Sequence, residues 1–165
     1  MTFKQIRLFI GICIVFILFA VTAWFIKAYK MPPELKTEDI ELRNEAGSTF
    51  HTSDFKGQQY VLLSYFQTWC GDCIQELESI DALQTKVGKN KLKILMVSDE
   101  PWKKINHFKE KYCNTLDYYQ SPTSLNSQNI RVFPTTYLLD KNGSVVMSKI
   151  QAFDWSSDEV LQHIK

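Results

Sequence analysis

A chain of 165 residues can form one domain with a hydrophobic core and a short additional segment. Its 19 basic and 18 acidic residues give a formal net charge of +1, which gives no electrostatic reason to expect nucleic acid as a partner. Four cysteines (Cys13, Cys70, Cys73 and Cys113) are too few for a disulfide-stapled scaffold, and only Cys70 and Cys73 are close in sequence.

Residues 1–30 predict a membrane anchor. Leu8 to Ile26 is an uncharged run of about nineteen residues, and a helix of that length crosses the ~30 Å hydrocarbon core of a bilayer. A signal peptide is the alternative, because Val21-Thr22-Ala23 resembles a small-residue cleavage site. We favour an uncleaved anchor, because the apolar run continues to Ile26 and is longer than the core of an ordinary signal peptide.

Residues 31–39 predict a linker, and the folded domain is expected over 40–165. The linker contains a double proline and mixed charges, which favour extended backbone over helix. The first part of the domain has two short alternating stretches, broken at Ala46-Gly47 and Lys56-Gly57. This pattern predicts a small hairpin before the main sheet.

Two strands and two helices are predicted next, in alternation. Tyr60–Gln67 and Leu92–Ser98 are nearly continuous apolar runs, typical of strands covered on both faces. Between them, apolar residues recur at three- and four-residue steps from Ile74 to Val87, which predicts an amphipathic helix that ends at Gly88. A second helix is predicted from Pro101 to about Lys111.

The C-terminal part predicts a second hairpin and a last helix. Residues 115–120 suit a short strand and 124–130 a short helix. Two apolar stretches on either side of Asn142-Gly143 predict a hairpin with a type I′ turn, in which both turn residues have positive φ. Ser156 and Glu159 have the spacing of a capping box, which predicts the start of the last helix. This order of elements indicates an α/β domain.

Cys70 and Cys73 lie between a predicted strand and a predicted helix. Unpaired backbone N–H groups and the helix dipole favour negative charge there, so the Cys70 thiolate is stabilised. Cys70 would form a mixed disulfide with a partner, and Cys73, one turn into the helix, would resolve it. A zinc site is a poor alternative, because no second C-x-x-C or H-x-x-x-H pattern supplies further ligands, so no metal is predicted. A pair without a chemical role is the remaining alternative.

These motifs together resemble the thioredoxin superfamily and, within it, the membrane-anchored thiol-disulfide oxidoreductases of the TlpA/ResA type. The resemblance is carried by Trp69-Cys70-Gly71-Asp72-Cys73, the strand before it, Phe133 to Thr136, and the sequence YLLDKNG that follows. It implies a thioredoxin-like α/β fold, in which helices flank a central mixed sheet and one transmembrane helix precedes the domain. It implies no cofactor.

The resemblance also implies roles for residues around the dithiol. Pro134 matches a proline that follows a cis peptide bond in the family, so Phe133 and Pro134 would frame the groove for a partner's extended segment. The alternative is that Pro134 only begins an edge strand. Trp69 and Gly71 would shape the site, and Trp69 would shield the disulfide and offer contact surface, although a core tryptophan is also compatible with the sequence.

Two carboxylates near the dithiol are further candidates. Glu76 lies where reductive relatives carry a glutamate, and its carboxylate could exchange protons with Cys73 or raise a cysteine pKa. An exposed helix residue is the alternative. Asp72 departs from the family, in which proline is usual at this position. Its charge would oppose a Cys70 thiolate, unless the helix N-terminus absorbs that charge, and repulsion would make the pair a better reductant.

The resemblance implies an enzyme that exchanges disulfides with extracytoplasmic proteins, as a reductant, for example of apocytochrome c before haem attachment. The alternatives are a disulfide oxidase or isomerase, and a module that binds partners without turnover. Expected partners are protein thiols and disulfides, an upstream membrane electron donor, and the bacterial inner membrane, with the domain on the periplasmic side. A peroxidase is not favoured, because no lone activated cysteine precedes Trp69. Cys13 and Cys113 are expected to be packing residues.

Overall fold

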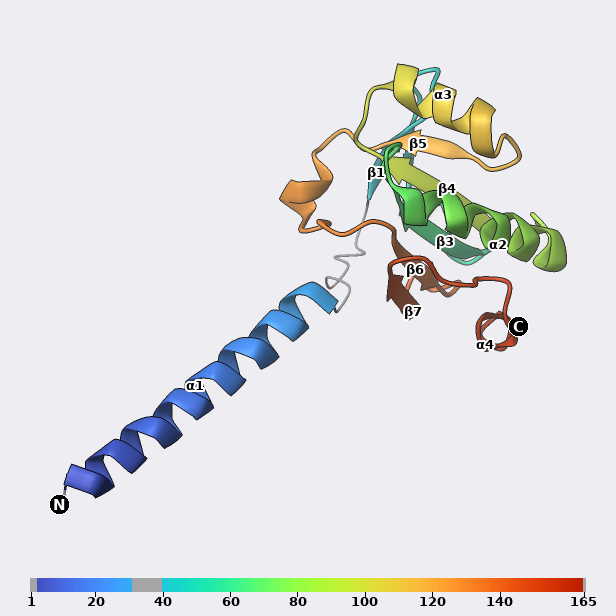
Figure 1. The fold of residues 1–165 in the computed structure, drawn as a ribbon. Coiled ribbons are helices and arrows are strands. Elements are labelled where there is room, and N and C mark those ends of the chain that lie inside the picture. The colour runs from blue at the N-terminus through green and yellow to red at the C-terminus, as the bar shows by residue number, and fades with distance from the viewer. Residues whose placement is uncertain (1–2, 31–39, 165) are drawn as a thin grey trace. The chain divides into compact units, whose positions relative to one another are not determined.

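The computed structural model describes residues 3–30 and 40–164, and the chain divides into two compact units, 1–31 and 32–165. The first unit contains one helix, α1 (Phe3–Lys30), shown in Figure 1. Among the described residues, no helix is both long and apolar enough to cross a bilayer, so the predicted transmembrane anchor is not confirmed. The predicted linker, 31–39, lies outside the described residues.

The second unit is built on a mixed seven-stranded sheet with the strand order β2-β1-β5-β4-β3-β6-β7. In chain order its elements are β1 (Glu41–Arg43), β2 (Thr49–His51), η1 (Thr52–Phe55), β3 (Tyr60–Tyr65), α2 (Gly71–Val87), β4 (Leu92–Ser98), α3 (Trp102–Tyr112), β5 (Tyr118–Gln120), η2 (Leu125–Gln128), β6 (Thr135–Leu139), β7 (Val145–Ile150) and α4 (Asp158–Leu161). Strands β3, β4 and β5 are parallel, whereas β6 is antiparallel to both β3 and β7. The predicted mixed α/β sheet is confirmed.

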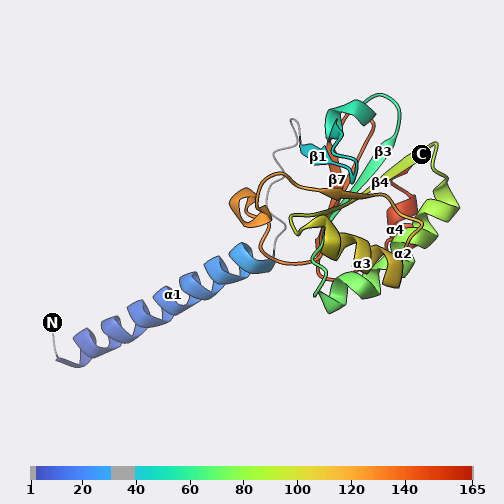
Figure 2. The ribbon, with the colours of Figure 1, turned by 90° about the horizontal axis from the view of Figure 1, so that it is seen from above.

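The central strands are buried on both faces, as their continuous apolar sequences predict. One face packs against α2, α3 and the C-terminal segment, which lie together in Figure 2, through residues such as Leu62, Ile80 and Phe108. The other face packs against η2 and the N-terminal hairpin through residues such as Leu63 and Leu125. Because both faces are covered, the functional groups gather at the ends of the strands.

The bounds of β4 are those predicted, and α2 ends at Gly88, which has a φ of 87° and caps the helix. The predicted N-terminal hairpin is also confirmed, since β1 and β2 pair antiparallel. It joins the sheet at its edge, beside β5.

The turn between β6 and β7 differs from the predicted type I′ turn. Only Gly143 of the pair Asn142-Gly143 has a positive φ, of 81°. The Asp140 carboxylate accepts hydrogen bonds from the backbone N–H groups of Asn142 (2.8 Å) and Ser144 (2.9 Å). These bonds stabilise the turn with Asn142 at negative φ. The pairing of β6 with β7 also has a register shift, between Leu138 and Leu139. The type I′ prediction was wrong because it omitted the Asp140 side chain.

The capping box predicted at Ser156 is also wrong. Helix α4 begins at Asp158, after Ser157 at the N-cap. The Ser156 hydroxyl donates to the Asp154 carboxylate at 2.7 Å, and the Glu159 carboxylate pairs with Lys149 at 3.2 Å. Both members of the expected box therefore have other partners.

Replacing Gly143 by alanine should lower the free energy of unfolding by about 1 kcal/mol, because a side chain at positive φ is strained. The new Cβ would also lie 2.7 Å from Cε of Lys56, whose flexible end can move aside. Urea unfolding of the full chain measures the change. Asn142→Ala is the control and should cost about 0.5 kcal/mol or less. Equal decreases in the free energy of unfolding for the two variants would support positive φ at both positions.

Candidate active site

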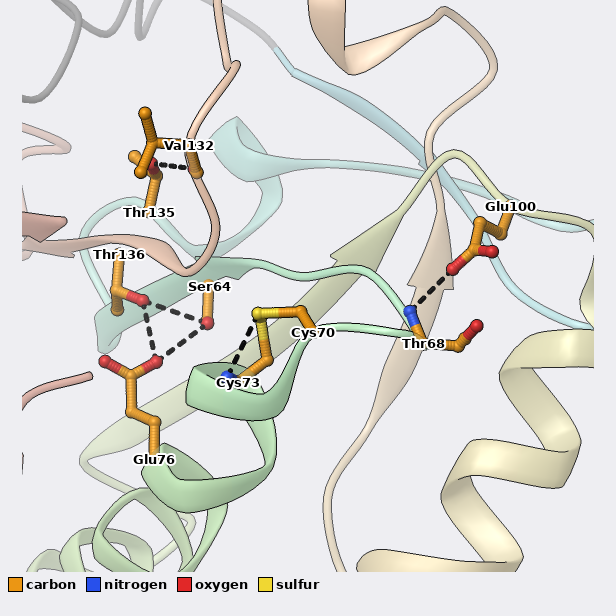
Figure 3. The surroundings of a disulfide bond; sticks show 9 residues. All are labelled: Ser64, Thr68, Cys70, Cys73, Glu76, Glu100, Val132, Thr135 and Thr136. Atoms are coloured by element: carbon orange, nitrogen blue, oxygen red, sulfur yellow. Dashed lines mark hydrogen bonds between the residues drawn. A yellow bond between two sulfur atoms is a disulfide. The ribbon is translucent and has the colours of Figure 1, made fainter. Parts of the chain in front are cut away.

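Cys70 and Cys73 form a disulfide at the start of α2, as Figure 3 shows. Strand β3 ends at Tyr65, a short loop follows, and Cys70 is the N-cap residue of the helix. Its Sγ atom accepts a hydrogen bond from the Cys73 backbone N–H at 3.1 Å. Both cysteines are buried, with 6% and 2% of their surfaces exposed. The predicted position of the pair, at the junction of a strand and a helix, is confirmed.

Two acidic residues after β4 hold the loop that leads to Cys70. The Thr68 N–H donates to Oε2 of Glu100 at 2.6 Å (Figure 3), and the Gln67 amide donates to Asp99 at 2.7 Å. Burial alone would raise the pKa of Glu100, but the Thr68 N–H and the Lys104 ammonium lower it overall. Glu100 was not identified from the sequence. Its position directly after β4 could have indicated that it lies near the Cys70 loop, because parallel strands β3 and β4 end at the same edge of the sheet.

The peptide bond between Phe133 and Pro134 is cis, as predicted. Thr135 pairs with Tyr65, which places Pro134 beside the loop that follows β3. Strand β6 lies between β3 and β7, so the alternative of an edge strand at Pro134 is wrong. Figure 3 shows Thr135 next to this bend, where its hydroxyl donates to the Val132 carbonyl at 2.6 Å.

Trp69 is largely exposed, with 71% of its surface accessible, so the alternative of a core tryptophan is wrong. Its ring contacts Phe133 edge-to-face, with ring centroids 6.1 Å apart. Trp69 precedes Cys70, and Phe133 precedes Pro134. The ring contact therefore joins the dithiol loop to the cis-proline loop.

Glu76 is buried, with 2% of its surface exposed, so the alternative of an exposed helix glutamate is wrong. The Trp155 indole N–H donates to its Oε1 atom at 2.6 Å. Oε2 lies 3.2 Å from the Thr136 hydroxyl and 3.5 Å from the Ser64 hydroxyl (Figure 3). Burial raises the pKa of Glu76 to about 7, although these hydrogen bonds oppose the increase.

The residues around Glu76 were not identified from the sequence. Ser64 and Thr136 are polar residues in the mostly apolar strands β3 and β6, and such residues indicate a buried polar partner. That pattern was a usable signal for these two. Trp155 gives no local signal, because it lies 79 residues from Glu76 in the chain.

Asp72 lies in the first turn of α2 and is exposed. Its carboxylate forms no hydrogen bond or ion pair with the described part of the chain, and Cys70 occupies the N-cap position. A Cβ added to Gly71 would meet nothing within 4 Å, so space does not explain a glycine there. Among the described residues the free cysteines are Cys13 and Cys113, and Cys113 is half-buried.

The chain is similar to known thiol-disulfide oxidoreductases and thioredoxin-like proteins. Residues 33–148 match the AhpC/TSA family. Over 171 aligned residues, the chain is 27% identical to the thiol-disulfide oxidoreductase ResA of Geobacillus kaustophilus, and the match covers 98% of this chain and 97% of that protein. Over 112 residues it is 30% identical to the thioredoxin-like protein YneN of Bacillus subtilis, covering 65% of each chain.

Solved structures share the fold. The exposed lipoprotein thioredoxin of Streptococcus pneumoniae superposes with a TM-score of 0.62 and 25% identity, over 76% of this chain and 97% of that one. A thiol-disulfide oxidoreductase from Bacteroides fragilis superposes with a TM-score of 0.65 and 21% identity, over 78% and 98%. The chain belongs to the AhpC/TSA family and is a TlpA/ResA-like thiol-disulfide oxidoreductase of the thioredoxin superfamily.

Proposed function

We propose that Cys70 and Cys73 are the redox-active pair and that the enzyme reduces disulfides in extracytoplasmic proteins. The observation that carries the proposal is the disulfide at the N-terminus of α2, next to an exposed tryptophan and a cis-proline loop. In this proposal Trp69, Phe133 and Pro134 contact the partner. Apocytochrome c before haem attachment is an example of such a substrate, and an upstream membrane electron donor returns the pair to the dithiol.

The reaction requires only the two cysteines and the partner's disulfide. The Cys70 thiolate attacks one sulfur of that disulfide, and the other partner sulfur leaves as a thiolate and takes up a proton. The Cys73 thiolate then attacks Sγ of Cys70, which releases the second partner thiol and forms the Cys70–Cys73 disulfide. Two electrons pass from the enzyme to the partner. The Cys73 N–H, 3.1 Å from Sγ of Cys70, stabilises the first thiolate.

Glu76 is the proposed proton acceptor for Cys73. It lies one helical turn after Cys73, and its pKa of about 7 allows both protonation states near neutral pH. In this proposal the carboxylate takes the Cys73 proton as the mixed disulfide is resolved.

The charge of Asp72 supports the reductive direction. It lies between the cysteines, and no described residue pairs with it. A negative charge there disfavours the thiolate and therefore makes the dithiol a stronger electron donor. An oxidase or isomerase is the second candidate, because the helix N-terminus and the Cys73 N–H stabilise the Cys70 thiolate instead.

The reduction potential of the Cys70–Cys73 couple decides between the two directions. The full chain is equilibrated with dithiothreitol or glutathione buffers, and the disulfide fraction is measured. A value near or below about −270 mV would support a reductase. A value above about −180 mV would indicate an oxidase or isomerase, and the reductive proposal would then be wrong.

The membrane anchor and the periplasmic location of the domain belong to this proposal and rest on the sequence. Leu8 to Ile26 carries no charge, and within α1 the large apolar side chains of Phe16 and Phe19 are exposed. Protease added outside intact cells should digest a tag at the C-terminus. A protected tag would contradict the proposed location.

Replacing Trp69 by alanine should slow reduction of a protein disulfide, such as that of insulin, by about tenfold, because exposed aromatic residues dominate contact energies. The rate with oxidised glutathione, which is too small to cover the Trp69 ring, should change far less. Val145→Ala, at an exposed apolar residue of β7, is the control and should affect neither rate. Equal losses with both substrates would indicate that Trp69 affects the dithiol rather than the partner.

A further inference from the structure

A basic hollow on the surface of α3 reaches the loop that precedes Cys70. It has a volume of about 620 Å³, and the residues that line it include Thr68, Lys103, Lys104, His107, Lys111 and Tyr112. We call it the α3 hollow. Neither Trp69 nor the Phe133-Pro134 loop lines it, so it is separate from the surface proposed above to contact the reacting disulfide.

The lining of the α3 hollow is positively charged. Three lysines supply this charge, a histidine also lines the hollow, and no acidic side chain is among the described residues that line it. One lysine, Lys104, is partly neutralised by an ion pair with Glu100 at 2.9 Å. The ammonium of Lys111 lies 5.0 Å from the ring centre of Tyr112, at the edge of the hollow. Lys103 and Lys111 therefore leave a net positive charge exposed to solvent.

The spacing of these basic residues fits an extended peptide. Lys103, His107 and Lys111 recur every four residues, so they lie along one side of α3. Successive members of this row are about 6 Å apart along the helix axis, at 1.5 Å per residue. Alternate residues of an extended chain, which point to the same side, repeat every ~6.6 Å. Carboxylates at alternate positions of a partner would thus meet successive basic side chains, with a lysine at each end of the row.

The α3 hollow is held in a fixed place relative to the dithiol. Thr68, which lines it, comes two residues before Cys70 and donates its N–H to Glu100 at 2.6 Å. Glu100 in turn pairs with Lys104 of α3 at 2.9 Å. A segment bound along α3 would therefore hold the rest of its protein close to Cys70.

We propose that the α3 hollow binds an acidic, extended segment of the protein whose disulfide reacts with Cys70. This proposal rests on the proposed function, and it adds the class of partner. Acidic segments raise the rate of encounter through long-range attraction, which salt screens, and they fix the orientation of the complex.

Peptide kinetics test the proposal. The probe is a short peptide whose single cysteine is linked by a disulfide to thionitrobenzoate, with glutamates at alternate positions. The comparison peptide carries glutamines instead. The reduced full chain becomes the Cys70–Cys73 disulfide, and each peptide disulfide yields one peptide thiol and one coloured thionitrobenzoate. The acidic peptide should react about tenfold faster at low ionic strength, and salt should remove the difference.

Charge reversal on α3 should abolish this preference. In the double variant Lys103→Glu, Lys111→Glu, the ratio of acidic to neutral rates should fall to one or below. The matched control is Lys89→Glu, Lys91→Glu, which makes the same change of charge just beyond the opposite end of α2 and should keep the ratio. An unchanged ratio in the α3 variant would overturn the proposal, as would equal rates for both peptides with the unmodified chain.

Binding of a cysteine-free, fluorescent acidic peptide provides a measurement that does not depend on redox chemistry. The α3 variant should bind it about tenfold more weakly than the matched control. If the neutral disulfide peptide is not reduced at all, the proposed function fails. The binding measurement then still tests whether the α3 hollow binds acidic peptides. Equal affinities would overturn the proposal. A second result would also overturn it. In that result the unmodified chain shows no preference for the acidic peptide but binds anionic lipid vesicles more tightly than neutral ones, and the α3 variant loses this lipid preference.

Discussion

Replacing Cys70 by serine should lower the rate of protein disulfide reduction by at least about a thousandfold, because a hydroxyl does not supply the thiolate nucleophile. Replacing Cys73 by serine should have a different effect. Cys70 still attacks, but nothing resolves the product, so a mixed disulfide between Cys70 and the partner accumulates. Non-reducing electrophoresis and mass spectrometry of the full chain with insulin measure both outcomes.

The control for these variants is Cys113→Ser, which changes a free, half-buried cysteine outside the disulfide. It should leave the rate unchanged. In cells, the double variant Cys70→Ser, Cys73→Ser should lose function. Retained function would show that the groove beside Pro134 acts by binding alone, and retained disulfide reduction by Cys70→Ser would show that another thiol carries the chemistry.

Much of the domain could be predicted because its signals are local. The continuous apolar runs of β3 and β4 identify strands covered on both faces, and the three- and four-residue steps after Cys73 identify α2. Gly88 ends that helix with a positive φ, as glycine commonly does. The cis bond before Pro134 could be predicted only from the resemblance, because a single X–Pro pair is usually trans.

The wrong predictions, the type I′ turn and the capping box, concern places where a side chain hydrogen-bonds to backbone groups or pairs with a distant residue. Asp140 accepts two turn N–H groups, which local turn preferences for Asn142 and Gly143 do not include. Glu159 pairs with Lys149 across the last connection instead of forming a capping box. In each case the deciding bond competes with the local pattern.

The contacts of Glu76 are the strongest example, because they join three separate parts of the chain. Ser64 belongs to β3 and Thr136 to β6, and Trp155 follows β7. Their spatial convergence depends on the complete sheet. The same convergence removes water from the carboxyl group, and this loss of solvation is the main cause of its raised pKa.

Glu76 should make the stability of the enzyme depend on pH. Its pKa is about 7 in the folded chain, against an ordinary value of 4.5, so between these pH values the folded state holds a proton that the unfolded state has released. The free energy of unfolding therefore falls by on the order of 3 kcal/mol in total as pH rises through this window, and it levels off above about pH 7.

Replacing Glu76 by glutamine should remove this pH-dependent part of the free energy of unfolding. In the unmodified chain the Trp155 indole nitrogen lies 2.6 Å from Oε1 of Glu76. The glutamine amide oxygen can still accept this N–H, but the side chain cannot ionise. Urea unfolding of the oxidised full chain between pH 5 and pH 8 measures the difference from the unmodified chain. The variant should gain relative stability as pH rises, by on the order of 3 kcal/mol.

Glu78→Gln is the matched control, because Glu78 is an exposed glutamate on the same helix. Its stability should follow that of the unmodified chain at every pH, since an exposed carboxylate loses little solvation on folding. If Glu76→Gln also follows the unmodified chain, the buried carboxyl titrates in its ordinary range. Glu76 would then be fully ionised at neutral pH, and the proposed transfer of a proton from Cys73 to Glu76 would lose its physical basis.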